Sequence, residues 1–159
     1  MNYTELCTNI QDICENEFSA TELAMFTQQA EQKIYNTVQI PALRKYVTSS
    51  TAAGSAYLAI PSDFLYCYSL SVIDASGEHH FLLNKDLNLI RQAYPVNNVA
   101  SRGLPKHYAN YNDTEFLLGP TPDAVYSAEI NYGYYPESIV TASTTWLKSE
   151  EHTSELQSH

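Results

Sequence analysis

Two adjacent histidines, His79 and His80, are the residues of this chain best suited by type to bind a metal ion. A zinc site needs imidazole, thiolate or carboxylate ligands that converge on one point. The pair falls in a short stretch with strand character, where neighbouring side chains point to opposite faces, so the two rings cannot hold one ion together. His107 could join one of them, but no cysteine or carboxylate has a spacing that supports a site. We therefore predict exposed strand histidines and no metal site.

The three cysteines, Cys7, Cys14 and Cys67, are the candidate nucleophiles or disulfide partners. Cys7 and Cys14 lie seven residues apart in a stretch with helical periodicity, which separates their Cα atoms by ~10 Å. A disulfide requires less than ~7 Å. Neither these two nor Cys67 stands in a recognisable nucleophile motif. We predict three free thiols in a reducing compartment.

Other catalytic signatures are missing from the sequence. The chain has no Gly-x-Ser-x-Gly elbow and no glycine-rich phosphate loop. The acidic residues Asp12, Glu15 and Glu17 indicate a solvated helix face, since nothing ties them to a cleft. We predict no catalytic residue and no cofactor, and hence a protein that is not an enzyme.

Tyrosine is unusually frequent, with 13 residues. A stacking platform for single-stranded nucleic acid pairs aromatic rings with a positive groove, but the tyrosine-rich segment before Pro136 is flanked by Glu129, Asn131 and Glu137. Packing in the core or between subunits suits tyrosine better, because its hydroxyl can stay hydrated. The residues that we expect at a subunit interface are Tyr132, Tyr134, Tyr135, Leu23 and Phe26.

The bulk composition indicates one acidic globular domain. The chain has 159 residues, is 44% hydrophobic and carries a net charge of −10, unlike the apolar-poor composition of disordered chains. Basic residues exceed acidic ones only in scattered places, such as around Leu43-Arg44-Lys45, so the basic stripe of a nucleic-acid binder is missing. No apolar run approaches the ~20 residues of a membrane span, and the N-terminus lacks a signal-sequence pattern. We expect neither secretion nor membrane insertion.

The elements that position these residues begin with two amphipathic helices, at about 3–16 and 20–38. Ser19 with Glu22 matches a capping box, and Asn2 with Glu5 resembles one. Two helices joined by a few residues should pack antiparallel as a hairpin. The apolar stripe predicted for the second helix is Leu23, Phe26, Ala30, Ile34 and Val38.

A β-rich part follows at about 46–136, interrupted by a helix at about 85–93 that we expect to begin at Asn84 as its cap. Period-two alternation places Tyr66, Tyr68, Leu70 and Val72 on one face of a strand, with Ser69 and Ser71 opposite. In the last strand, Tyr126, Ala128, Ile130, Tyr132 and Tyr134 share one face. Helices at one end and strands in the middle predict an α+β fold, with the helical hairpin packed on an antiparallel sheet.

Five stretches together resemble the head–tail adaptor, or head-completion, proteins of short-tailed phages. The resemblance covers about residues 3–147 and depends on the order and spacing of the stretches, since no single one is diagnostic. They are Gln29-Ala30-Glu31-Gln32-Lys33-Ile34-Tyr35, Leu43-Arg44-Lys45, Tyr57-Leu58-Ala59-Ile60-Pro61-Ser62-Asp63-Phe64-Leu65, Leu118-Gly119-Pro120-Thr121-Pro122-Asp123 and Tyr132-Gly133-Tyr134-Tyr135-Pro136.

The resemblance implies a structural subunit of a ring, typically of twelve copies, in the neck of the virion. Such a connector joins the portal protein to the tail nozzle or tube protein and is assembled in the host cytoplasm. Genomic DNA passes through it without sequence-specific binding, and an acidic channel would let the DNA slide because it repels phosphate. The rival interpretations are a β-rich tail-fibre or receptor- or carbohydrate-binding module, and a small phage hydrolase.

The end of the sequence departs from this pattern. Residues 149–159 closely resemble the translation of a widely used sequencing-library adaptor, although Lys148 stands where that reading frame would give arginine. We therefore expect a single adaptor domain at 1–147 and a non-native tail at 148–159. The resembling proteins continue after the motif at Trp146-Leu147 with further helices, which we expect to be missing here. Their loss should leave Leu23, Phe26 and Ile34 partly uncovered.

Overall fold

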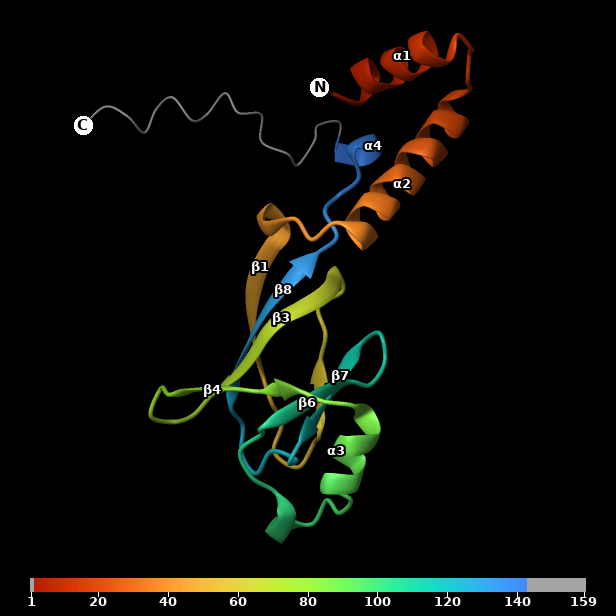
Figure 1. The fold of residues 1–159 in the computed structure, drawn as a ribbon. Helices are drawn as coiled ribbons and strands as arrows, with labels where there is room; N and C mark the ends of the chain where they lie inside the picture. The colour runs from red at the N-terminus through yellow and green to blue at the C-terminus, as the bar shows by residue number, and fades with distance from the viewer. Residues whose placement is uncertain (1, 143–159) are drawn as a thin grey trace, which may run out of the picture. The chain divides into compact units, whose positions relative to one another are not determined.

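The computed structural model describes residues 2–142, which divide into two compact units (Figure 1). The helical unit combines residues from both ends of the chain, 2–43 and 135–142, and the β unit is the continuous segment 44–134. The predicted non-native tail, 148–159, lies outside the described residues.

Each long helix of the helical unit begins at a capping box. The helices are α1 (Tyr3–Cys14), α2 (Ala20–Thr37) and the short α4 (Ile139–Ala142), and a 3₁₀ turn lies at Pro41–Leu43. In the first box the Asn2 side chain accepts from the Glu5 N–H, and the Glu5 carboxylate accepts from the Asn2 N–H, both at 2.9 Å. Ser19 and Glu22 form the second box, so both predicted caps are confirmed.

The close antiparallel packing expected between α1 and α2 is weak. No residue of α1 is buried, and few residues of α1 contact α2. Leu6 and Ile10 are half-buried while Ile13 is exposed, so the apolar stripe is too short to hold the helix firmly along a partner. α2 instead packs against α4, where the Ile139 N–H donates to the Glu31 carboxylate at 2.9 Å.

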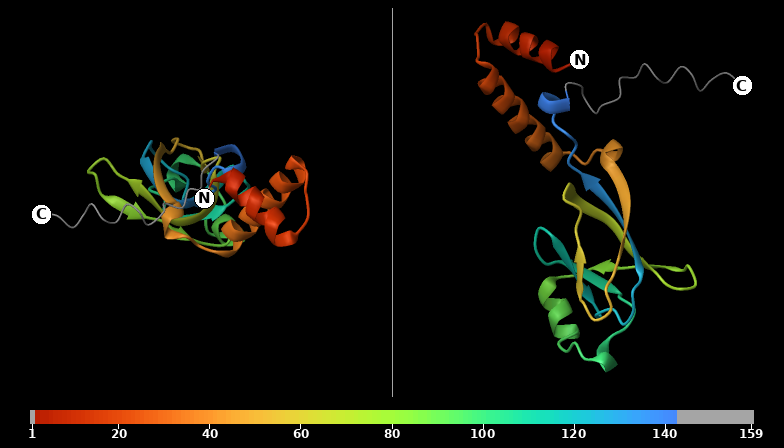
Figure 2. Two further views of the ribbon diagram at one scale, coloured as in Figure 1. Left: turned by 90° about the horizontal axis from the view of Figure 1, so that it is seen from above. Right: turned by 180° about the vertical axis from the view of Figure 1, so that it is seen from behind.

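The β unit consists of two four-stranded sheets (Figures 1 and 2). The first sheet has the order β1-β8-β3-β4 and is antiparallel throughout. The second has the order β2-β7-β6-β5 and is mixed, because β5 runs parallel to β6. The strands are β1 (Arg44–Ser50), β2 (Tyr57–Ala59), β3 (Phe64–Ile73), β4 (His79–Phe81), β5 (Leu83–Asn84), β6 (His107–Asn110), β7 (Glu115–Gly119) and β8 (Ser127–Tyr134).

The core of the β unit lies between the two sheets, and the second sheet is covered on its other face by α3 (Leu87–Ala93). Both faces of β7 are therefore buried: Phe116 and Leu118 point into the main core, and Leu117 packs with Ile90 of α3. The main core residues are Leu58, Leu70, Val72, Leu82, Tyr108, Phe116, Leu118, Ala128, Ile130 and Tyr132. The predicted α+β class, with helices ahead of strands and one helix inserted among them, is confirmed.

The predicted start of the inserted helix was wrong by a few residues. Leu83 and Asn84 pair with β6 as the short strand β5, and the helix begins after Asp86, whose side chain accepts from the Asn88 N–H at 2.8 Å. A strand pairing with a distant segment took precedence over the helical periodicity at Leu83.

The expected face of β3 was also wrong, because the strand is bulged. Its pairing with β8 shifts between Phe64 and Tyr66 and again between Cys67 and Ser69. Each extra residue reverses the face that the following side chains occupy. Leu70 and Val72 enter the core as predicted, but Cys67 joins them, and Tyr66 and Tyr68 lie on the outer face of the sheet.

Candidate interaction surfaces

His80 lies beside two carboxylates at the turn between β3 and β4. Its Nε2 is 2.9 Å from the Asp74 carboxylate, and Glu78 offers a third ligand atom within 4.8 Å of the others. Sequence spacing missed this group because the turn, with Gly77 at φ 86, folds Asp74 back onto the strand that follows. Hydrogen bonds from His80 and from Ser76 hold the pKa of Asp74 below its usual value. His79 has other neighbours, Ser71 and Phe81, so the two histidines are separated as predicted.

All three cysteines are free thiols. Cys67 is half-buried on the core face of β3, and burial raises the pKa of its thiol. The neighbouring Tyr108 has its pKa raised to about 12, chiefly by burial and then by its hydrogen bond with Cys67. Neither group is activated as a nucleophile in this setting, since a thiolate is favoured by nearby positive charge.

Two of the five expected interface residues, Tyr132 and Tyr134, belong to the β unit. Tyr132 is only 2% exposed, and its hydroxyl donates to the Asp63 carboxylate at 2.9 Å. Asp63 also forms an ion pair with Lys45, whose Nζ lies 4.5 Å from the centre of the Tyr134 ring. Tyr132 therefore offers little surface to a partner and instead orients a charged pair at the end of β1. Tyr134 is half-buried.

The other three, Leu23, Phe26 and Tyr135, belong to the helical unit. Leu23 is buried. Tyr135 packs edge-on against the Tyr35 ring, and its hydroxyl donates to the Asn36 side chain at 2.6 Å. Phe26 is 40% exposed and packs at 5.6 Å against the Phe18 ring.

Phe26 begins a row of exposed apolar residues along α2. The row, which we call the α2 stripe, has a spacing of four residues and consists of Phe26, Ala30, Ile34 and Val38. Residues four apart lie above one another on a helix, so the side chains form one continuous surface. Ile34 is 47% exposed, as expected, but the prediction that Leu23 would be uncovered with it was wrong, because Leu23 is buried, and so is Tyr35.

The outer face of the first sheet carries a second exposed surface that sequence patterning missed. The Arg44 guanidinium lies 3.6 Å from the centre of the Tyr68 ring, and the hydroxyls of Tyr66 and Tyr68 are hydrogen-bonded at 2.9 Å. The Tyr66 ring covers Gly133, where a Cβ would meet it at 2.5 Å. The basic pair at the start of β1 is the one feature of the sequence that pointed to this surface. The bulge that turns Tyr66 and Tyr68 outward cannot be recognised from the neighbouring residues.

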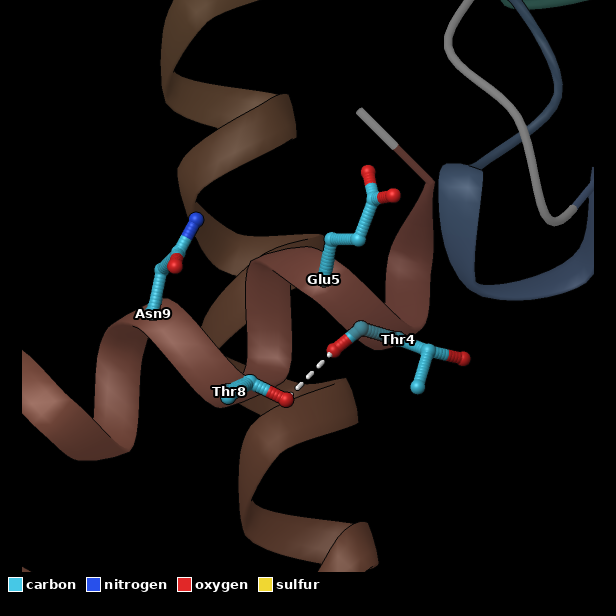
Figure 3. A pocket seen from close by; sticks show the side chains of 4 residues that line it. All are labelled: Thr4, Glu5, Thr8 and Asn9. Carbon is cyan, nitrogen blue, oxygen red and sulfur yellow. Dashed lines mark hydrogen bonds between the residues drawn. The ribbon is translucent and has the colours of Figure 1, made fainter.

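Two hollows in the described surface are considered as candidate sites through the residues that line them. The one in Figure 3 is lined by Thr4, Glu5, Thr8 and Asn9, all from α1, and its drawn hydrogen bond runs from the Thr8 hydroxyl to the Thr4 carbonyl. A second hollow of about 390 Å³ lies beside α3 in the β unit, with Arg91, Tyr94 and Asn97 in its lining. Neither brings a nucleophile and a base together.

The chain belongs to the SU10 adaptor protein family, which matches residues 1–156. It is therefore a phage adaptor, a structural component of the virion that interacts with other head or tail proteins. The resemblance found in the sequence is confirmed at this level. No curated protein matches the chain. Among residues 2–142, no helix has the length and apolar character needed to cross a membrane.

Proposed function

We propose that this adaptor is a subunit of a connector ring that joins the portal protein to the tail nozzle or tube protein around the DNA exit channel. The family match over residues 1–156 is the observation that carries the proposal. The form that we propose is a ring of about twelve copies, assembled in the host cytoplasm, as the resemblance to head–tail adaptors implies. Such a ring arises when a head-to-tail contact between subunits repeats and closes.

The α2 stripe is the proposed contact of the helical unit with a neighbouring protein. Four apolar side chains in one row on a surface helix leave an apolar patch in water. Phe26, with its ring already fixed against Phe18, can bind with little loss of side-chain entropy. Tyr135 contacts Tyr35 and Asn36, on another side of α2, and is proposed as a separate interface residue.

The charge of the chain supports passage of DNA without attachment. The net charge is −10, and Lys45 is already neutralised by Asp63. A channel lined by such subunits would repel phosphate and favour sliding. A ring whose channel-facing residues were mostly lysine and arginine would contradict this part of the proposal.

Cryo-electron microscopy of the full-length protein mixed with the portal protein from the same phage genome tests the proposal directly. We expect a closed ring of adaptor density on the tail-facing side of the portal. A mixture in which the adaptor stays free, while both proteins are folded, would refute the connector function. A matched sample with an Ile34→Glu adaptor should show whether the α2 stripe is needed for binding.

A further inference from the structure

The first sheet of the β unit ends in a strand whose outer edge is open. β1 is paired only with β8 among the described strands, and nearly all its residues are exposed. The Thr51 N–H donates to the carbonyl of Tyr126, which lies opposite Thr51 when the register of β1 and β8 is continued by one residue. Since hydrogen-bonding direction alternates along an antiparallel strand, the backbone groups of Tyr46, Thr48 and Ser50 point away from β8.

The opposite edge of the same sheet, β4, is open in the same sense. β4 is paired only with β3 among the described strands. Hydrogen bonds from the Leu82 N–H to Leu70 and from the Asp74 N–H to Glu78 show which residues of β4 face β3. By the same alternation, the backbone groups of His79 and Phe81 point outward from the sheet.

Both open edges carry an aromatic ring on the same face of the sheet. Tyr46 on β1 is 72% exposed and Phe81 on β4 is 67% exposed. Tyr46 is in register with Asn131, and Phe81 with Ser71, which both lie on the outer face. In each strand, therefore, the residues with free backbone groups are also those whose side chains lie on the outer face.

The charges at the two edges are complementary. β1, Arg44–Ser50, contains no aspartate or glutamate and begins with Arg44 and Lys45, of which Lys45 is already paired with Asp63. No described carboxylate pairs with Arg44, which stacks on Tyr68. The turn that leads into β4 carries Asp74 and Glu78. Arg44 at one edge and these two carboxylates at the other favour contact between copies, in a chain whose net charge of −10 otherwise opposes it.

We propose that β1 of one copy pairs with β4 of the next copy and so continues the first sheet from subunit to subunit. β1 and β3 run in the same direction because both are antiparallel to β8, and β4 runs opposite to β3. A sheet continued in the same orientation therefore brings β1 and β4 together as antiparallel strands. The register that we propose has Tyr46 opposite Phe81 and Thr48 opposite His79, because aromatic and β-branched cross-strand pairs are favourable.

This inference rests on the proposed assembly of several copies, and it defines the contact as head-to-tail. Pairing of β1 with β1 of a second copy would make a closed two-fold dimer and leave Phe81 in water. Pairing of β1 with β4 covers both exposed rings and leaves open edges only at the ends of the array. A head-to-tail contact is the kind that builds rings.

Disulfide trapping between two differently tagged full-length chains tests the pairing. One chain carries Tyr46→Cys and the other Phe81→Cys, and both carry Cys7→Ser and Cys14→Ser. Cys67 is kept, because it lies on the core face of β3. Directly opposed residues of a hydrogen-bonded pair have Cα atoms ~5.5 Å apart, a separation that suits a disulfide. We expect the mixed dimer on a non-reducing gel and little of either like-tagged dimer.

Tyr57→Cys is the matched control for Tyr46→Cys, since Tyr57 is also an exposed tyrosine on a strand edge. The pairing is overturned if the Tyr57→Cys chain traps the Phe81→Cys chain equally well. It is also overturned if the Tyr46→Cys chain links mainly to itself, which would reveal the two-fold dimer. A wild-type protein that stays monomeric at every concentration would overturn it as well.

A second pair of variants tests whether backbone hydrogen bonds of β1 hold the two copies together. Thr48→Pro removes an N–H that points away from β8, so the pairing of β1 with β8 is kept, while Thr48→Ala keeps the N–H and removes the side chain. We expect association measured by analytical ultracentrifugation to weaken about tenfold for Thr48→Pro and little for Thr48→Ala. Equal association of two folded variants would refute strand pairing. Portal binding that persists without trapping would leave the connector proposal standing and remove only this contact.

Discussion

Some residues of the β unit are held in place by close contacts with the side chains of another element. Gly119 illustrates this, because it ends β7 directly beneath α3. A Cβ at this position would meet the Tyr94 ring at 2.6 Å and the Ile90 side chain at 2.9 Å. Both neighbours are held by α3, so neither can withdraw without moving the helix.

We expect Gly119→Ala to lower the free energy of unfolding by about 1–3 kcal/mol, the usual cost of overpacking. Gly103→Ala is the matched control, since the nearest atom to its Cβ would be Pro120 at 3.8 Å, an ordinary contact. Urea denaturation of both variants checks the prediction. A loss for Gly103→Ala as large as that for Gly119→Ala would contradict the packing argument.

The Lys45–Asp63–Tyr132 cluster predicts a specific dependence of stability on pH. Burial acts to raise the pKa of Asp63, but hydrogen bonds from Lys45 and Tyr132 outweigh it and lower that pKa below its usual value. A carboxylate with a lowered pKa in the folded state contributes stability above its unfolded-state pKa of about 4 and loses it as pH falls further.

Asp63→Asn should therefore be less stable than the wild type at neutral pH, and the difference should shrink as the pH falls below about 4. Thermal melts of both proteins across this range provide the measurement. Asp113→Asn, in the exposed turn between β6 and β7, is the control and should follow the wild type. A difference that stays constant with pH would exclude the charge of Asp63 as its cause.

At the scale of elements, sequence patterns predicted the features that depend only on neighbouring residues. The capping boxes at Asn2 and Ser19 use only neighbouring residues, and both form. The alternation of Ala128, Ile130 and Tyr132 in β8 also holds, because this strand lies between two others and has one face in the core.

Patterns failed where distant segments decided the structure. The bulges of β3 depend on pairing with β8, some sixty residues further along the chain, so period-two counting misplaced Tyr66 and Tyr68. The short strand β5 likewise exists because β6 pairs with it. The outer-face surface with Arg44 could be found only after both pairings were known.

The α2 stripe gives a prediction at this same scale. Ile34→Glu should weaken association of the protein with itself or with the portal by about tenfold or more, because a charge would be buried in an apolar contact. The free energy of unfolding should change little, since Ile34 is exposed in the described unit. Gln32→Glu adds the same charge at another exposed position of α2 and should leave association intact.

At the scale of the whole molecule, the sequence predicted the class of fold and the family of phage adaptors, which depend on the order of many stretches. The division into two units was not foreseen. The choice of residues for a proposed interface also changed with the structure: Tyr132, expected at an interface, lies in the core, whereas Tyr46 and Phe81 lie exposed at strand edges.

The acidic charge leads to a prediction for the intact protein. We expect no detectable binding of double-stranded DNA at about 0.15 M salt, because a chain of net charge −10 lacks the cations that displace counterions from DNA. Fluorescence anisotropy with a labelled duplex provides the measurement, and a basic DNA-binding protein is the positive control. Salt-sensitive binding in the micromolar range would argue against a channel in which DNA slides.

In the sequence, the β unit is inserted between the two segments of the helical unit, and the first and last residues of the β unit lie on neighbouring strands. Its first residue, Arg44, is the register partner of Gly133, one residue from its last. An insert whose ends adjoin can be removed, lengthened or exchanged without opening a gap in the chain that hosts it. Evolution could therefore exchange the β unit as a whole while the helices on either side of it keep their sequence.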